Sequence, residues 1–195
     1  MVKKSIFAFS NDNAGVSTIE FVVLISGILA LVFFVLETTL YLFFSASLNK
    51  AAQAGVRAAV VSTPVIAGLP VTNQRTANGN FGINCSDASA PCETFAAVSC
   101  SGNSCDAAEF DRIFAHMNGF SGQLQPANVT ISYEPTGLGF AGGPTIPLVT
   151  VTVSGVPFRT GIVGLLLTNT GVLSSLPTHS VSMTGEDLDR GGAGA

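Results

Sequence analysis

Charged residues are scarce in this 195-residue sequence. Asp, Glu, Lys and Arg make up 10% of it, against about 25% in typical soluble domains. Eight basic residues stand against twelve acidic ones, and the formal net charge is −4. Binding to nucleic acid depends on clustered Lys and Arg side chains that neutralise phosphates. Because the sequence has no basic stripe, we expect no nucleic-acid partner.

Side chains for catalysis or metal binding are equally few. The chain has two histidines, His116 and His179, and their spacing is not typical of metal ligands. No nucleophile motif accompanies them, and no pair of carboxylates has cleft-like flanking sequence. We therefore expect that the protein is not an enzyme, and we expect no catalytic residue, no metal site and no cofactor.

One long apolar stretch organises the chain and contributes to its high mean hydropathy of +0.52. It runs from Phe21 to Phe44 and exceeds the ~20 residues that cross ~30 Å of hydrocarbon at ~1.5 Å per residue. An Ala-rich helical pattern follows it as far as the helix breaker Pro64. We predict one long α-helix over residues 16–62, with a segment at about residues 21–44 that crosses a lipid bilayer.

Two acids accompany this apolar stretch. Glu20 lies at its start, and Glu37 lies about 25 Å further along a helix. A carboxylate at the bilayer centre costs ~2.5–3.5 kcal/mol, so an acid in such a segment normally lies near an edge or has a function. For Glu37, snorkelling to the interface and a specific role remain equally open. For Glu20 we expect a specific role.

Beyond the membrane the predicted helix has one face of small and apolar residues. They recur near helical spacing, whereas Lys50, Gln53 and Arg57 fall largely on the other side. Small side chains allow close approach, so we expect a downstream sheet to pack here. The residues of this face are Leu48, Ala51, Ala52, Gly55, Val56 and Ala59.

The four cysteines lie in a polar stretch, residues 63–105, which we expect to form loops. An even number of clustered cysteines beyond a membrane segment is typical of disulfides in an oxidising compartment. Zinc binding is the weaker alternative, because no close Cys-x-x-Cys pair is present. Three pairings are possible, and short loops close most readily. We favour Cys85 with Cys92 and Cys100 with Cys105.

Residues 106–186 have the pattern of a small α+β domain. A helix is expected from Asp106, which can cap it, to Asn118. Alternating apolar residues then predict three strands, around 129–133, 149–153 and 181–183. The expected fold class is α+β, in which a long N-terminal transmembrane helix continues into an extracytoplasmic domain with a roughly three-stranded antiparallel sheet.

Two further stretches complete the expected organisation. The apolar run from Ile162 to Leu167 is too short to span a bilayer. It forms either a buried connection or an exposed contact patch. The Gly- and Ala-rich end, residues 187–195, is expected to be a flexible tail.

The start of the apolar stretch resembles the processing signal of type IV pilins and pseudopilins. The residues that carry this resemblance are Gly15-Val16-Ser17-Thr18-Ile19-Glu20-Phe21. A late acid at Glu37 and an Ala-rich continuation over residues 49–59 narrow it to the TadE-like minor pseudopilins of Tad/Flp (type IVc) pilus systems. Two features depart from the pattern. Asn13 and Ala14 replace a basic run, and Val16 replaces the Phe that is frequent at the start of major pilins.

The resemblance implies a function and a set of roles. Residues 1–15 would be a leader, which a prepilin peptidase cuts between Gly15 and Val16. Glu20, beside Phe21, would set the assembly register by pairing with the terminal amine of a neighbouring subunit.

The same resemblance implies partners and a location. The partners would be the prepilin peptidase, a sister pseudopilin, the major Flp pilin and an inner-membrane assembly platform. The location would be a single pass through the inner (cytoplasmic) membrane. Its orientation follows from the cysteines, because disulfides form in an oxidising compartment: the N-terminus would be cytoplasmic and the domain periplasmic or extracellular.

Other functions remain open alternatives. A secreted protein would be cut by signal peptidase after Ser45-Ala46-Ser47, although the apolar run exceeds the 7–15 residues of a signal-peptide core. A membrane-anchored binding or adhesion protein leaves little trace in one sequence. The mature N-terminus separates the cases: Val16 supports a pseudopilin, Leu48 supports secretion and Met1 supports a plain membrane anchor.

Overall fold

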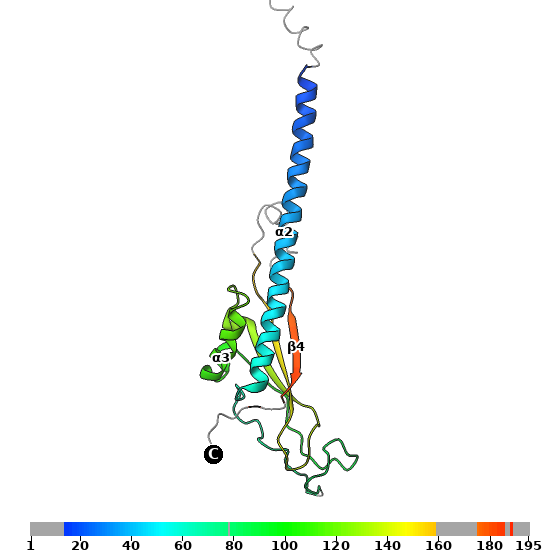
Figure 1. Ribbon diagram of the computed structural model, residues 1–195, viewed down its shortest axis with the longest axis vertical. Helices are drawn as coiled ribbons and strands as arrows, with labels where there is room; N and C mark the ends of the chain where they lie inside the picture. Colours follow the sequence, from blue (N-terminus) through cyan, green and yellow to red (C-terminus); the bar gives the residue numbers. More distant parts are fainter. Residues whose placement is uncertain (1–13, 78, 159–174, 186–187, 189–195) are drawn as a thin grey trace, which may run out of the picture.

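The computed structural model describes residues 14–77, 79–158, 175–185 and 188. One long helix, α2, covers Ala14–Val61, and at ~1.5 Å per residue its 48 residues extend about 72 Å. The small domain is gathered along the C-terminal half of this helix (Figure 1). Pro64 follows shortly after α2, where the restricted backbone of the residue before a proline disfavours further helix. The predicted bounds, 16–62, agree with this helix to within two residues.

The domain contains a four-stranded antiparallel sheet and a second helix. The sheet has the order β1-β2-β3-β4, and neighbouring strands pair antiparallel throughout. Helix α3 packs against α2, which also contacts β3 and β4. The elements are β1 Val98–Ser101, η1 Gly102–Ser104, α3 Ala107–Asn118, η2 Pro126–Asn128, β2 Val129–Pro135, β3 Pro147–Val153 and β4 His179–Thr184.

The fold class is α+β as predicted, but the sheet has four strands rather than three. The additional strand, β1, lies within the stretch that was expected to form loops. Its sequence is Val-Ser-Cys-Ser, and Cys100 is its one buried residue. Four residues are too few to show a clear alternation of apolar and polar side chains. This strand is therefore defined by its pairing with β2 at the edge of the sheet and could not be recognised from its own sequence.

The predicted helix and the two central strands form for the reasons visible in sequence. The Asp106 carboxylate accepts hydrogen bonds from the backbone N–H groups of Ala108 and Glu109, which caps α3. Along β3, buried and half-buried residues alternate through the whole strand. This alternation directs one face of the sheet into the core.

The core joins α2, α3 and the inner face of the sheet in one cluster. Its largest fully buried side chain is Tyr133 in β2, whose hydroxyl oxygen accepts a hydrogen bond from the Val65 N–H at 3.2 Å. The Val65 carbonyl in turn accepts from the Asp106 N–H at 2.7 Å. Val65, four residues beyond the end of α2, is thereby tied both to the sheet and to the start of α3.

Three segments of the predicted organisation lie wholly or largely outside the described residues. The apolar run from Ile162 to Leu167 falls within 159–174, and the expected tail, 187–195, is described only at Leu188. Almost all of the expected leader, residues 1–13, also lies outside them.

Burial of Tyr133 predicts a titration that can be followed directly. Removal from water raises the pKa of the Tyr133 phenol above its ordinary value of 10.0, and the hydrogen bond from Val65 opposes this only in part. The unfolded chain would therefore lose this proton at lower pH than the folded chain. The stability contribution is fully present below pH 10 and is lost as pH rises through the folded-state pKa.

The chain suits this measurement because it has two tyrosines and no tryptophan. In a Tyr41→Phe variant, the absorbance change of phenolate formation reports Tyr133 alone, and we expect its midpoint above pH 10. A midpoint at or below pH 10 would contradict the buried position of this side chain. Tyr133→Phe, the control, should show no such transition in the same background.

Candidate membrane helix and its junction with the domain

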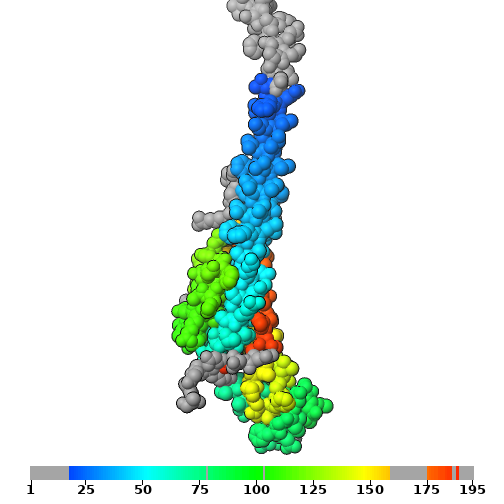
Figure 2. Space-filling model, in the orientation of Figure 1, coloured from blue at the N-terminus to red at the C-terminus, as the bar shows by residue number. Residues whose placement is uncertain are grey.

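The N-terminal half of α2 has no protein packed around it among the described residues. Its large apolar side chains are exposed, for example Phe21 at 62% and Leu31 at 64%. Figure 2 shows this half standing clear of the domain. The segment Thr18–Val61 is long and apolar enough to cross a membrane. Exposed apolar side chains on this scale are stable in hydrocarbon and not in water.

The residues of the predicted processing signal lie at the start of this open half. Gly15 and Val16 are in the first turn of α2, and Glu20 is exposed little more than one turn later, beside exposed Phe21. After a cut between Gly15 and Val16, the new amine and the Glu20 carboxylate would both lie at the same end of the helix. The structure thus leaves Glu20 accessible to a neighbouring molecule.

Glu37 is placed differently from Glu20. It is half-buried, whereas the other described side chains of residues 18–40 are exposed. Positions four and seven residues later, Tyr41 and Phe44, point from the same face of a helix. Both contact Phe158, so Glu37 lies on the domain-facing side of α2, one turn before Tyr41. The sequence placed this acid near the outer membrane boundary but did not indicate its face.

An aromatic cluster joins α2 to the domain at this level. The Phe158 ring lies edge-on to the Tyr41 ring, with 5.3 Å between their centroids, and 6.1 Å from the Phe44 ring. One turn further, the Ser45 hydroxyl and Nε2 of His179 are 3.1 Å apart in hydrogen-bond contact. Phe158 and His179 are not recognisable from the sequence as partners of α2, because contacts between segments more than 100 residues apart leave no local pattern.

Below the aromatic cluster, the small-residue face of α2 packs as predicted. All six of its residues are buried, while Lys50, Gln53 and Arg57 are exposed. Gly55 shows the closest approach: a Cβ atom there would lie 2.6 Å from Sδ of Met117 in α3. A Cβ atom at that distance would force the Met117 side chain to shift, so the glycine allows the side chain of α3 to pack directly against the backbone of α2.

The cysteines form the two expected disulfides, in different settings. Cys100–Cys105 joins β1 to the turn before α3 and borders the core. Cys85–Cys92 lies in the loops at the far end of the domain from the apolar half of α2. Within its loop the Asp87 carboxylate accepts hydrogen bonds from the backbone and hydroxyl of Ser89, which lower the pKa of that carboxyl.

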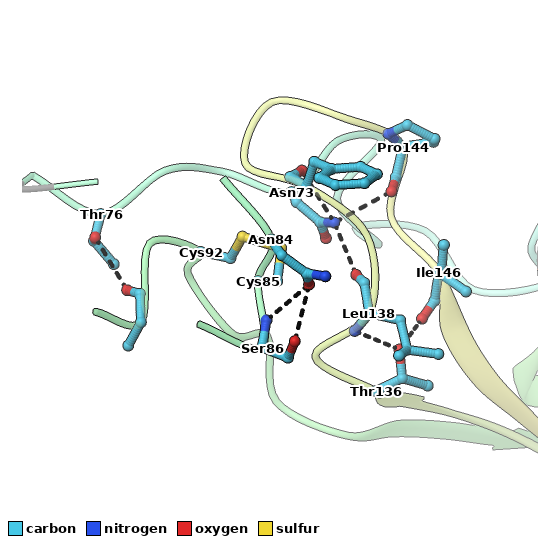
Figure 3. The surroundings of a disulfide bond; sticks show 12 residues. Asn73, Thr76, Asn84, Cys85, Ser86, Cys92, Thr136, Leu138, Pro144 and Ile146 are labelled. Atoms are coloured by element: carbon cyan, nitrogen blue, oxygen red, sulfur yellow. Dashed lines mark hydrogen bonds between the residues drawn. A yellow bond between two sulfur atoms is a disulfide. The ribbon is translucent and has the colours of Figure 1, made fainter. Parts of the chain in front are cut away.

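Asn73 organises the distal loops around the Cys85–Cys92 disulfide. Its side-chain amide donates to the carbonyl oxygens of Leu138 and Pro144, at 3.1 and 3.2 Å (Figure 3). Both partners lie in the loop between β2 and β3, more than 60 residues along the chain from Asn73. No motif marked this residue, and its role emerges only from the tertiary structure.

The histidines do not form a site with other ligating groups in the part of the chain that is described. His116 is exposed on α3, and His179 is the partner of Ser45. No group of three or more His, Cys, Asp or Glu side chains able to hold a metal occurs within residues 14–77, 79–158, 175–185 and 188.

Comparison with known families gives one match, and it falls on the long helix. Residues 15–57 match the family model described as TadE-like protein. This segment is therefore similar to TadE-like proteins. No curated protein and no solved structure matches the chain.

The TadE-like match extends from Gly15 to Arg57. It therefore covers Glu20, Glu37 and most of the small-residue face, and it stops before the sheet begins. The match supports involvement in a Tad pilus system and association with a membrane. The domain beyond residue 57 is characterised by its structure alone.

Gly55→Leu tests the close packing between the TadE-like helix and α3. Overpacking of a filled core costs ~1–3 kcal/mol, which exceeds the ~1 kcal/mol that leucine gains over glycine in a helix. We expect a lower unfolding midpoint of the full-length protein in detergent, followed by near-ultraviolet circular dichroism.

Ala46→Leu, at an exposed position of the same helix, is the matched control. It should leave the midpoint nearly unchanged. Equal midpoints for Gly55→Leu and Ala46→Leu would show that α2 and α3 do not meet at Gly55.

Proposed function

We propose that the protein is a non-enzymatic minor pseudopilin that acts in the assembly or initiation of a Tad/Flp-type pilus or secretion filament. The observation that carries this proposal is the division of α2. One face of its C-terminal half packs against the domain, and its N-terminal half exposes apolar side chains with Glu20 at the start. Such a helix can exchange lipid for neighbouring helices without any rearrangement of the domain.

The position of Glu20 suits a register-setting role. A carboxylate in a low-dielectric surrounding is costly unless a cation pairs with it. In an assembly of parallel helices, the terminal amine of a neighbouring subunit is a cation at the corresponding height. At 4 Å and an effective dielectric constant near 20, such a pair attracts by about 4 kcal/mol. Displacement of the subunits along the helix axis would lose this attraction and leave two uncompensated charges.

The proposal includes the partners and the location that this role requires. A prepilin peptidase would cut between Gly15 and Val16, and a sister pseudopilin, the major Flp pilin and an inner-membrane platform would contact the helix and the domain. The protein would pass once through the inner membrane, with its N-terminus in the cytoplasm. The two disulfides support placement of the domain in an oxidising compartment.

A membrane-anchored binding or adhesion protein is the second candidate. It is favoured by exposed apolar side chains on the distal loops, namely Val71, Phe81, Leu138 and Phe140. Surface labelling of intact cells separates the two functions. Labelling of these loops from outside the cell, without any pilus component, would favour adhesion.

Glu20→Ala tests the proposed function. Removal of the carboxylate makes the helix more apolar, so we expect normal membrane insertion by carbonate extraction. Assembly should fall, because the amine of the neighbouring subunit loses its partner. The measurements are recovery of pili from cells and cross-linking of the variant to the sister subunit.

Glu134→Ala is the matched control, since Glu134 is an exposed acid on the domain. It should assemble as the unaltered protein does. Normal piliation by Glu20→Ala would remove the register role from this residue, and failure of both variants would indicate a general loss of folding.

A further inference from the structure

A shallow hollow lies where the domain meets the apolar half of α2. Its volume is ≈ 250 Å³, and it is lined by Phe44, Gln123, Pro157 and Phe158. The lining comes from three separate segments: α2, the loop after α3 and the segment after β3. Tyr41 adjoins it through its contact with the Phe158 ring. We call these five residues the membrane-side rim.

The path of the chain places the loop after α3 on this side of the domain. Asp106, before α3, bonds to Val65 beyond the C-terminal end of α2. Met117 then approaches Gly55, and Gln123 shares the hollow with Phe44. The chain therefore runs back along α2 toward its apolar half, as Figure 1 shows for α3. Phe120, in the same loop, has 52% of its side chain exposed.

The rim lies at the depth of the lipid headgroups. If hydrocarbon begins at Phe21, ~30 Å of it ends near Leu40 at ~1.5 Å per residue. Headgroups add roughly 5–8 Å on each side. Phe44 lies four residues beyond Leu40, or about 6 Å. The rim thus falls within the headgroup layer.

Among the described residues, the membrane-side end of the domain also carries no formal charge. Residues 41–49, 119–129, 150–158 and 175–182 contain no Asp, Glu, Lys or Arg. The first charged residue of α2 after Glu37 is Lys50, six residues beyond Phe44. Charges near hydrocarbon are costly to desolvate, whereas amphipathic rings such as that of Tyr41 are favoured at the interface. Because this end lacks charged side chains and presents the ring of Tyr41, it is suited to contact with a lipid surface.

We propose that the membrane-side rim rests on the bilayer and that outer-leaflet lipid fills the hollow between Phe44, Gln123, Pro157 and Phe158. This inference rests on the proposed membrane span of α2. Contact at the rim limits the tilt of the domain relative to the membrane. It also holds the distal loops, with Phe81 and Phe140, at the end farthest from the bilayer.

Tryptophan fluorescence tests the contact, because the chain has no native tryptophan. Three single variants of the full-length protein are reconstituted into phosphatidylcholine vesicles with plain or brominated acyl chains. Gln123→Trp reports the rim, Leu31→Trp the membrane-spanning half of α2, and Phe81→Trp the distal loops. Phe81 is the control for nonspecific lipid affinity, since 70% of its side chain is exposed.

We expect bromine to reduce the emission of Leu31→Trp and Gln123→Trp and to leave Phe81→Trp unchanged. Quenching of Leu31→Trp alone would overturn the rim contact and leave the membrane span intact. Quenching of all three would also overturn it, because the domain would then lie along the bilayer. Absence of quenching at Leu31 would refute the membrane span, and the rim contact with it.

Discussion

The close packing of small residues along one face of α2 is the constraint on which the rest of the structure depends. Ala51, Ala52 and Ala59 are fully buried, and at Gly55 the Met117 side chain of α3 lies where a Cβ atom would be only 2.6 Å from its Sδ. Because this face is flat, the sheet and α3 both approach the helix backbone closely. The domain therefore packs along the side of the C-terminal half of α2 and does not begin only beyond the end of the helix.

One helix consequently meets two different environments. Before Tyr41 its described apolar side chains are exposed on all sides and suit hydrocarbon, and from Leu48 to Val60 most of them are buried against the domain. The aromatic contacts of Tyr41 and Phe44 with Phe158 mark the change. Glu37 lies on the same face, one turn earlier. An acid at this point is near the end of the hydrocarbon, where its desolvation cost is lower than at the centre.

Much of this architecture is readable from local sequence patterns. The 3.6-residue period gave the buried face of α2, the alternation of Val and Thr predicted β3, and Asp106 marked the start of α3. Short loops also favoured the two disulfides that the structure contains. In each case the determining residues are neighbours along the chain, so the physical cause is visible without tertiary structure.

The remaining features depend on distant contacts. Strand β1 is too short to be recognised from its sequence, and it forms by pairing with β2. The tie from Asn73 to Leu138 and Pro144 joins separate loops, and Phe158 reaches α2 from more than 110 residues away. For the candidate site, the sequence located Glu20 and Glu37 along the helix. It could not show which face of α2 the domain would cover, and hence that Glu37 is half-buried.

The central claim is that α2 continues without a break from the bilayer into the domain. Hydrogen–deuterium exchange of the full-length protein in lipid nanodiscs tests it most directly, through the backbone amides between Leu40 and Leu48. A continuous helix predicts slow exchange across this stretch, comparable to that of residues 51–59. Rapid exchange confined to residues 40–48 would show a hinge between membrane and domain and would contradict the account.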